Sequence, residues 1–133
     1  MLEITPGTTL PGGSYALGAQ RHELLIGALG GNAPADGSAH PLAAWLVAWG
    51  GCGVSIGDLF AAAGVPMEDG PMLGEWAVEY TGTFEPGASY DVTAEILELE
   101  EKRGRTGRFD LVRSRIDIAG VASCRFTYVL PRR

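Results

Sequence analysis

Hydrophobic residues follow two patterns in this chain, a helical pattern in the first half and an alternating pattern in the second half. Residues 39–64 form the only long and nearly uncharged apolar segment, with Asp58 as its single carboxylate. Its large side chains recur at helical spacing and are Leu42, Trp45, Leu46 and Trp49. A helix that is apolar on all sides is buried on all sides, so we expect this segment to be the central helix of the core.

Local signals divide this central segment into two helical parts. Three glycines predict an interruption near its middle, at Gly50, Gly51 and Gly53. Ser55 then restarts the helix, because a serine hydroxyl accepts a hydrogen bond from the backbone three residues later, where Asp58 stands. Gly64 suits the position just after the last turn, where a left-handed backbone is common.

From Leu73 onward apolar and polar residues alternate, which is the period of a half-buried strand. We expect four strands of about ten residues joined by short turns, an antiparallel meander. Two of them begin near Leu73 and Tyr90, and the others cover 109–118 and 121–130. A phase slip at Leu97 predicts a β-bulge in the second of these strands.

The first forty residues carry weaker signals. Residues 1–13 are rich in Pro, Gly and Thr and are expected to form an extended arm, and Tyr15 begins a possible short edge strand. Residues 20–29 have the apolar spacing of a short amphipathic helix, on whose polar side His22 is expected to be a solvated surface residue. Residues 30–38 combine Gly, Asn, Pro and Asp and are expected to form a loop.

One buried helix followed by antiparallel strands predicts a single α+β domain over residues 1–133, with an antiparallel sheet curled around the helix. Such a unit leaves a sheet edge and one helix end open. Pairing of two units edge to edge would cover both, so we expect a dimer.

Composition narrows the range of partners. The formal charge of −6 and the pI of about 4.8 disfavour nucleic acid, because phosphates are repelled by an acidic surface. No basic segment followed by an apolar one opens the chain, and glycines together with Asp58 break the apolar segment. We therefore expect a cytoplasmic protein without a membrane span.

The two cysteines, Cys52 and Cys124, lie in separate apolar segments. Buried free thiols are the favoured interpretation, with a disulfide as the alternative. The sequence has no Cys or His spacing typical of a metal site, and nothing in it calls for a cofactor.

Two stretches of the sequence resemble a known family. They are AHPLAAWLVAW at 39–49 and DGPMLGEWAVEYTGTFEPGASYDVTAEI at 69–96. Together with the order of elements, they are similar to the hotdog fold, in particular to the MaoC-like group of acyl-thioester hydratases and dehydratases. The resemblance implies a substrate that is an acyl thioester of coenzyme A or of an acyl-carrier protein. It also implies a homodimer or pairing with a second hotdog chain.

The acid/base motif of that family is Gly-Asp-x-Asn-Pro-x-His, and its counterpart here is ALGGNAPAD at 28–36. Gly30 and Pro34 match the motif. Gly31, Ala33 and Asp36 stand where the family has Asp, Asn and His, so the motif is degenerate in this chain.

Two residues near the start of the central helix, His40 and Asp36, are candidates for the acid/base role. His40 is the best general base by residue type, since imidazole titrates near neutral pH. Asp36 could orient it or act as a second acid/base group. Backbone N–H groups after His40 would bind the thioester oxygen. The structural alternatives are that His40 caps the first turn of the helix and that Asp36 forms a turn.

Residues around this entrance are candidates for substrate binding, with turn or core roles as the alternatives. They are Asn32, Pro41, Leu42, Trp45, Asp69 and Gly70. A basic cluster at the predicted 102–107 turn is a candidate for binding the carrier's phosphates, with a solvated hairpin as the alternative. Its members are Lys102, Arg103 and Arg105, with Arg108 beside them.

The sequence leaves three functions open. The first is addition or elimination at the α,β-positions of an acyl thioester, with His40 and Asp36 as acid and base. The second is hydrolysis of the thioester on the same fold. The third is a catalytically silent hotdog subunit that binds a ligand or completes a heteromeric dehydratase.

Overall fold

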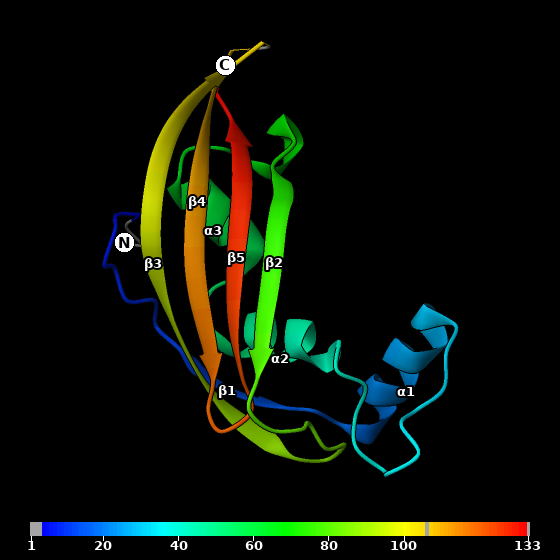
Figure 1. Cartoon of the computed structure of the whole chain (residues 1–133). Helices are drawn as coiled ribbons and strands as arrows, with labels where there is room; N and C mark the ends of the chain where they lie inside the picture. Colours follow the sequence, from blue (N-terminus) through cyan, green and yellow to red (C-terminus); the bar gives the residue numbers. More distant parts are fainter. Residues whose placement is uncertain (1–3, 106, 133) are drawn as a thin grey trace.

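The computed structural model describes residues 4–105 and 107–132 as one five-stranded antiparallel sheet lying over two central helices (Figure 1). The elements are, in chain order, β1 (Gly13–Ala16), α1 (Ala19–Leu29), α2 (Ala43–Gly51), α3 (Ile56–Ala62), the 3-10 turn η1 (Met67–Asp69), β2 (Met72–Tyr80), β3 (Ser89–Gly104), β4 (Gly107–Ile118) and β5 (Ala122–Pro131). This arrangement confirms the predicted α+β class, with the sheet packed against a buried helix.

The order of strands in the sheet is β1-β3-β4-β5-β2. Only β3, β4 and β5 form a meander, because β2 pairs with β5 and occupies the far edge. The prediction of a four-stranded meander was therefore wrong for its first strand. Alternation of polar and apolar residues indicates that a strand exists but does not show which strand pairs with it. Here residues 81–88 carry the chain across the end of the sheet, from β2 to β3.

The predicted central helix is divided as expected, into α2 and α3, which are bent by 55° relative to each other. The hydroxyl of Ser55 accepts a hydrogen bond from the Asp58 N–H at 3.0 Å, so the predicted cap of α3 is confirmed. Gly64 adopts a left-handed φ of 82° just beyond α3, also as predicted. α2 begins only at Ala43, because the residues before it form a separate turn.

Two of the three glycines do not break α2 but let strands approach it. Gly50 and Gly51 both lie inside the helix. A Cβ atom at Gly50 would lie 2.3 Å from the ring of Tyr15 in β1, and one at Gly51 would lie 2.5 Å from Val92 in β3. The end of α2 therefore rests directly on the β1–β3 edge of the sheet.

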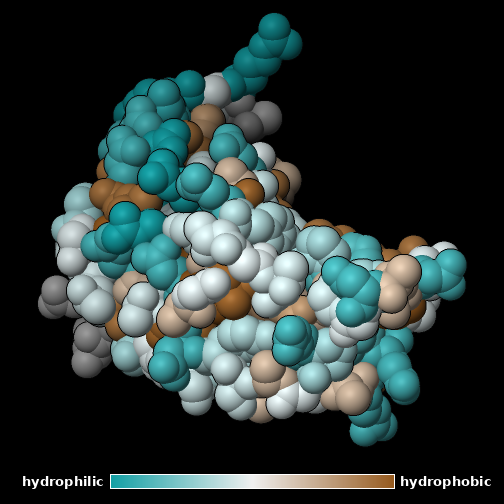
Figure 2. Space-filling model, turned by 60° about the horizontal axis from the view of Figure 1, so that its bottom comes forward, coloured by the Kyte–Doolittle hydropathy of each residue, from teal (hydrophilic) through white to brown (hydrophobic). Residues whose placement is uncertain are grey.

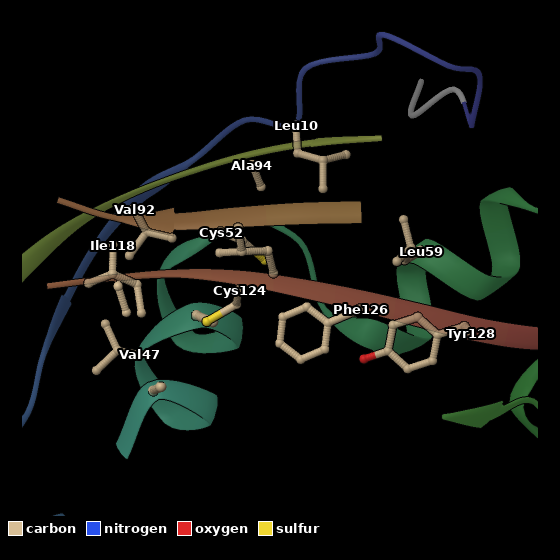
Figure 3. Close-up of a cluster of buried hydrophobic side chains, with 14 of the residues drawn as sticks. Leu10, Val47, Cys52, Leu59, Val92, Ala94, Ile118, Cys124, Phe126 and Tyr128 are labelled. Atoms are coloured by element: carbon tan, nitrogen blue, oxygen red, sulfur yellow. The ribbon is translucent and has the colours of Figure 1, made fainter. Parts of the chain in front are cut away.

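The inward faces of the strands form the core, as the alternation predicted (Figure 3). All five inward residues of β5 are buried, namely Ala122, Cys124, Phe126, Tyr128 and Leu130. The register shifts between Ile96 and Glu98, which confirms the bulge predicted at Leu97. Cys52 and Cys124 are both free and buried, as expected.

An aromatic cluster joins α2 to the β2 edge of the sheet. Trp45 of α2 lies edge-on against Trp76 and Phe126, with ring centroids 5.3 and 5.4 Å away. Trp76 stacks on Phe126 at an interplanar angle of 6°. Each such pair contributes about 0.5–1.5 kcal/mol beyond the area it buries, so β2 is held firmly although it has a neighbour on one side only.

The predicted short elements near the N-terminus are present. β1 contains Tyr15 and pairs with β3 as an edge strand, and α1 matches the predicted helix. α1 projects sideways from the body of the molecule (Figure 1). Of the predicted arm, residues 1–3 lie outside the described residues, while Leu10 is buried beside Ala94 (Figure 3).

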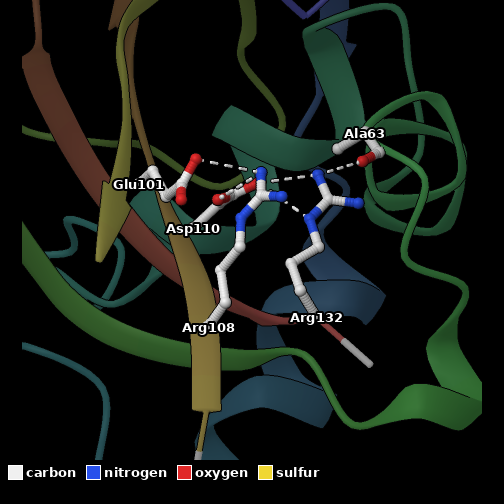
Figure 4. Close-up of polar contacts among 5 residues, drawn as sticks. All are labelled: Ala63, Glu101, Arg108, Asp110 and Arg132. Carbon is white, nitrogen blue, oxygen red and sulfur yellow. Dashed lines mark hydrogen bonds and ion pairs between the residues drawn. The ribbon is translucent and has the colours of Figure 1, made fainter. Parts of the chain in front are cut away.

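A buried ion pair fastens the end of β5 to α3 (Figure 4). Asp110 of β4 is 3% exposed, and its carboxylate binds the guanidinium of Arg132 at 2.7 Å. Arg132 also donates to the Ala63 carbonyl, at 2.6 Å, just beyond the end of α3. A cation at this position interacts favourably with the negative end of the helix dipole.

Membrane-spanning potential is limited to one helix pair. Within 4–105 and 107–132, no single helix is long and apolar enough to cross a bilayer, although α2 and α3 pass that test when taken together across their 55° bend.

Candidate functional site

His40 occupies the turn that leads into α2, the place to which the sequence assigned a possible general base. Its backbone N–H donates to Nε2 of His22 in α1 at 2.9 Å. Its own ring nitrogen Nδ1 accepts the Leu42 N–H at 3.1 Å. The ring therefore binds the backbone of the turn just before α2.

The residues on either side of His40 are bound by a different part of the chain. The Ala39 N–H donates to the Phe84 carbonyl at 2.7 Å. The Tyr80 hydroxyl, at the end of β2, donates to the Pro41 carbonyl at 2.7 Å. We call residues 39–42 the α2 entrance. Burial raises the pKa of Tyr80, so its hydroxyl stays protonated and keeps donating at neutral pH.

The N–H groups that follow His40 are engaged within the entrance itself. Leu42 N–H is bound by His40 Nδ1, as described above, and Ala43 N–H donates to the His40 carbonyl at 2.9 Å. The expectation of free N–H groups at this helix end was therefore wrong for these two residues. A thioester oxygen can reach the Leu42 N–H only if the His40 ring moves away from it.

Asp36 is exposed in the loop before the entrance and binds Ser38 rather than His40. Its Oδ1 accepts from the Ser38 hydroxyl at 2.6 Å and from the Ser38 N–H at 2.9 Å. These hydrogen bonds lower the pKa of Asp36, so it is a carboxylate at neutral pH. Among the described residues, no hydrogen bond joins Asp36 to His40.

An apolar groove of about 350 Å³ lies beside the entrance. One wall is the loop before α2 and the other is the segment that follows β2, and the lining residues are Pro34, Ser38, Ala39, Pro41, Tyr80, Gly82, Thr83 and Phe84. Pro41 is the one predicted substrate-binding residue among them. Tyr80 and Phe84 were missed as site residues, because their alternating spacing indicated only a strand.

A second groove, of about 510 Å³, separates α1 from α2. Its walls come from both helices and are lined by Gln20, Arg21, Leu24, Leu25, Ala28 and Leu46. Leu24 is 68% exposed. Figure 2 brings this end of the molecule forward and shows the region of α1 standing out at the right of the body.

The remaining predicted substrate-binding residues are dispersed. Asn32 is exposed in the loop, and Trp45 belongs to the aromatic cluster. Asp69 ends η1 and Gly70 turns the chain into β2, with a left-handed φ of 79°. β2 separates these two residues from the groove by its whole length, roughly 26 Å at the usual rise per residue.

The basic cluster lies at the end of the sheet opposite the α2 entrance, where β3 turns into β4 (Figure 1). Lys102 pairs with Glu100 at 3.0 Å, and Arg108 pairs with Glu101 at 3.4 Å. Arg103 and Arg105 are exposed and have no ion pair to another described residue. Within one chain, the cluster is therefore remote from the groove.

Neither metal binding nor thiol chemistry finds support in the described side chains. Three or more His, Cys, Asp or Glu residues do not converge anywhere in 4–105 and 107–132. Burial raises the pKa of Cys52, and it raises the pKa of Cys124 to about 11. Both thiols therefore stay protonated and unreactive at neutral pH.

No protein-family model matches the sequence, and no curated protein matches it significantly. Solved structures do match the fold. One is a chain of the ChsH1-ChsH2 complex from Mycobacterium tuberculosis, with a TM-score of 0.67 and 16% identity over 92% of this chain and 88% of that one. Another is a monoamine oxidase regulatory protein from Archaeoglobus, with a TM-score of 0.66 and 10% identity over 98% and 92%.

A third match is the (R)-hydratase from A. caviae involved in PHA biosynthesis, with a TM-score of 0.52 and 16% identity over 98% of both chains. Identities this low establish a shared fold and leave the reaction open. The matches extend over nearly the whole chain, which consists here of the five-stranded sheet and the helices beneath it. The chain therefore has the hotdog fold that its sequence predicted.

Proposed function

We propose that this chain is an acyl-thioester-binding subunit of a hotdog hydratase or dehydratase, and that a second hotdog chain completes its site. The reaction would be addition or elimination at the α,β-positions of an acyl group carried by coenzyme A or an acyl-carrier protein. The observation that carries the proposal is the apolar groove beside the α2 entrance. The fold it shares with an (R)-hydratase supports this reaction class.

The groove suits an acyl chain better than a polar ligand. Its volume of about 350 Å³ lies within the range of small-molecule sites. Its lining includes two prolines, an alanine and Phe84, and its Tyr80 hydroxyl is already engaged with Pro41. The walls therefore offer contact surface with few competing hydrogen-bond donors.

The acid/base chemistry favours a contribution from a second chain. Hydration adds a water oxygen to the β-carbon and a proton to the α-carbon, so one group must accept a proton and another must donate one. Asp36 is held by Ser38, and Nδ1 of His40 is held by Leu42. His40 Nε2 is left as one possible proton carrier. The other group must then come from a partner, or Asp36 must leave Ser38.

The free edge at β2 is the best place for such a partner. β2 pairs on one side only, and large apolar side chains near both of its ends are exposed. Met72 and Leu73 are 57% and 45% exposed at its start, and Tyr80 is 43% exposed at its end. An unpaired, partly apolar edge strand favours pairing with another strand. A chain of the ChsH1-ChsH2 complex shares this fold.

Two-fold pairing through β2 would bring candidate residues from the two chains to the same end of the sheet. Strands related by such an axis run antiparallel, so the start of one β2 lies beside the end of the other. Asp69 and Gly70 precede β2, and the groove follows it. The Asp69–Gly70 turn and the basic cluster of the second chain would then lie at the same end as the α2 entrance of the first.

Binding of crotonyl-CoA, measured by calorimetry, tests the groove. We expect Thr83→Trp to fill it and to weaken binding at least about tenfold. Thr93→Trp, on an exposed position of β3 away from the groove, is the matched control and should bind like the wild type. Equal affinities for the two variants would contradict the groove as the acyl site.

Hydration of crotonyl-CoA tests the need for a second chain. We expect little turnover by the pure chain and a gain when a second hotdog chain that carries the Asp/His pair is added. Full turnover by the chain alone, lost in His40→Ala and Asp36→Asn, would instead favour the same-chain acid/base pair. Release of free thiol without a hydroxyacyl product would indicate a thioesterase.

A further inference from the structure

His22 is the one buried residue of α1, whose other residues are exposed or half-buried, so the prediction of a solvated surface histidine was wrong. It is 5% exposed, while its neighbours Arg21 and Glu23 are exposed. α1 has eleven residues, a length at which a helix is only marginally stable without tertiary contacts. A polar side chain buried in such a setting needs a hydrogen-bond partner.

That partner is the backbone of the α2 entrance, eighteen residues further along the chain. Nε2 of His22 accepts the N–H of His40 at 2.9 Å. A ring nitrogen that accepts carries no proton, so the proton of the neutral ring is on Nδ1. Loss of this acceptor would leave the half-buried His40 N–H without its partner, which is unfavourable for a polar group shielded from water.

His40 is the residue through which this contact reaches α2. Its ring caps the Leu42 N–H at 3.1 Å, and its carbonyl accepts the Ala43 N–H at 2.9 Å. A shift of the His40 backbone would therefore move both the imidazole and the first donors of α2. This single backbone position thus sets the imidazole together with the Leu42 and Ala43 N–H groups.

The other contacts of the entrance cannot replace His22. Ala39 is bound by Phe84 and Pro41 by Tyr80, and both partners belong to the end of β2 and the segment after it. These contacts hold the entrance from the groove side. His22 holds the entrance from the side of α1. It binds His40, which lies between Ala39 and Pro41 in the chain.

We infer that His22 is a positioning residue for the α2 entrance: it fixes the backbone of His40, and through it the imidazole ring and the first N–H groups of α2. The inference rests on the proposed function in taking this entrance as the thioester site. Arg21 and Glu23, on the exposed side of α1, have no such contact with the entrance in the described structure.

Amide hydrogen exchange of the intact protein, followed by NMR, tests the anchor without any ligand. His22→Leu removes the acceptor, and His22→Gln keeps one, because its amide oxygen reaches about as far along the side chain as Nε2. We expect His22→Leu to speed exchange of the His40 N–H about tenfold relative to the Ala39 N–H. We expect His22→Gln to restore most of the protection.

The Ala39 N–H is the internal reference, because Phe84 binds it independently of His22. Equal exchange of the His40 N–H in wild type and His22→Leu would overturn the inference. So would parallel acceleration of both amides in His22→Leu, which would mean general destabilisation. Crotonyl-CoA binding by the wild type is a separate measurement: its failure would refute the proposed function and leave the exchange result standing.

Discussion

Asp110 illustrates at the scale of one residue how the sheet is fastened to α3. Its buried carboxylate faces Arg132, which in turn reaches the end of α3 (Figure 4). Removing one partner of a buried pair leaves the other charge without compensation. The contact therefore matters more to stability than the exposed ion pairs on the outer face of the sheet.

We expect Asp110→Ala to lower the free energy of unfolding by about 3 kcal/mol, because Arg132 would be left partly buried and unpaired. Urea unfolding followed by circular dichroism measures it. Glu98→Ala removes the exposed pair with Arg113 and serves as the control, with an expected cost below about 1 kcal/mol. A similar cost for both variants would show that the Asp110 pair has no special role.

The thiol of Cys124 makes stability depend on alkaline pH. Burial raises its pKa from 9.0 to about 11, so the folded state holds the proton more tightly than the unfolded state does. This contribution is complete below pH 9 and is lost as the pH rises from 9 to about 11. The raised pKa of Tyr128 adds a further loss at still higher pH.

We expect the free energy of unfolding to fall between about pH 8 and about pH 10.5, and to fall less in Cys124→Ala. Urea titrations at the two pH values measure both differences. The variant is also expected to be less stable at the lower pH, so the informative quantity is the change with pH. An equal change in both proteins would mean that Cys124 does not cause it.

At the scale of elements, the contact between α2 and the β1–β3 edge depends on glycine. Gly51 ends α2 where a Cβ atom would lie 2.5 Å from a Val92 methyl group. Gly27 lies inside α1, where an added Cβ would meet no atom within 4 Å. The two positions offer the same substitution in opposite packing environments.

We expect Gly51→Ala to destabilise the protein by about 2 kcal/mol, because overpacking outweighs the gain in helix propensity. Gly27→Ala should stabilise α1 by about 0.5–1 kcal/mol, since the added methyl group meets nothing. Thermal unfolding of both variants measures the difference. Stabilisation by Gly51→Ala would contradict the close packing of α2 on β3.

The elements themselves were largely predictable, because their signals are local. The Ser55 cap, the bulge at Leu97 and the inward face of β5 each follow from residues a few positions apart. The strand that pairs with β2 was not predictable, since this choice depends on how distant parts of the chain pack together. The His22 contact joins residues eighteen positions apart through a backbone N–H, which no side-chain pattern reports. The candidate site could thus be located from the sequence, but its hydrogen bonds could not.

At the scale of the whole molecule, the rest of the described chain leaves the outer edge of β2, the groove beside its end and most of α1 uncovered. α1 projects beyond the body (Figure 1). Exposed apolar residues occur on α1 and β2, including Leu24 and Met72. These features are consistent with a chain that works as one half of an assembly.

The proposed two-fold pairing of β2 strands has a specific geometric consequence. Met72 and Glu79 pair with Val129 and Ser123 on the outer side of the sheet, so they lie on one face near opposite ends of β2. Within one chain they are roughly 23 Å apart at the usual rise of a strand. With the two-fold axis at the middle of β2, between Glu75 and Trp76, Met72 of one chain would lie near Glu79 of the other.

We therefore expect a Met72→Cys, Glu79→Cys variant to form covalent dimers with a short bismaleimide, while each single variant stays uncoupled. The native thiols do not interfere, because burial raises the pKa of Cys52 and that of Cys124 and keeps both protonated. Denaturing gel electrophoresis measures the coupling, and light scattering of the unmodified protein measures its oligomeric state. Coupling of Met72→Cys alone would mean that the starts of the two β2 strands meet, which antiparallel pairing forbids. A monomer that never couples would refute the homodimer and leave pairing with a different hotdog chain as the way to cover this edge.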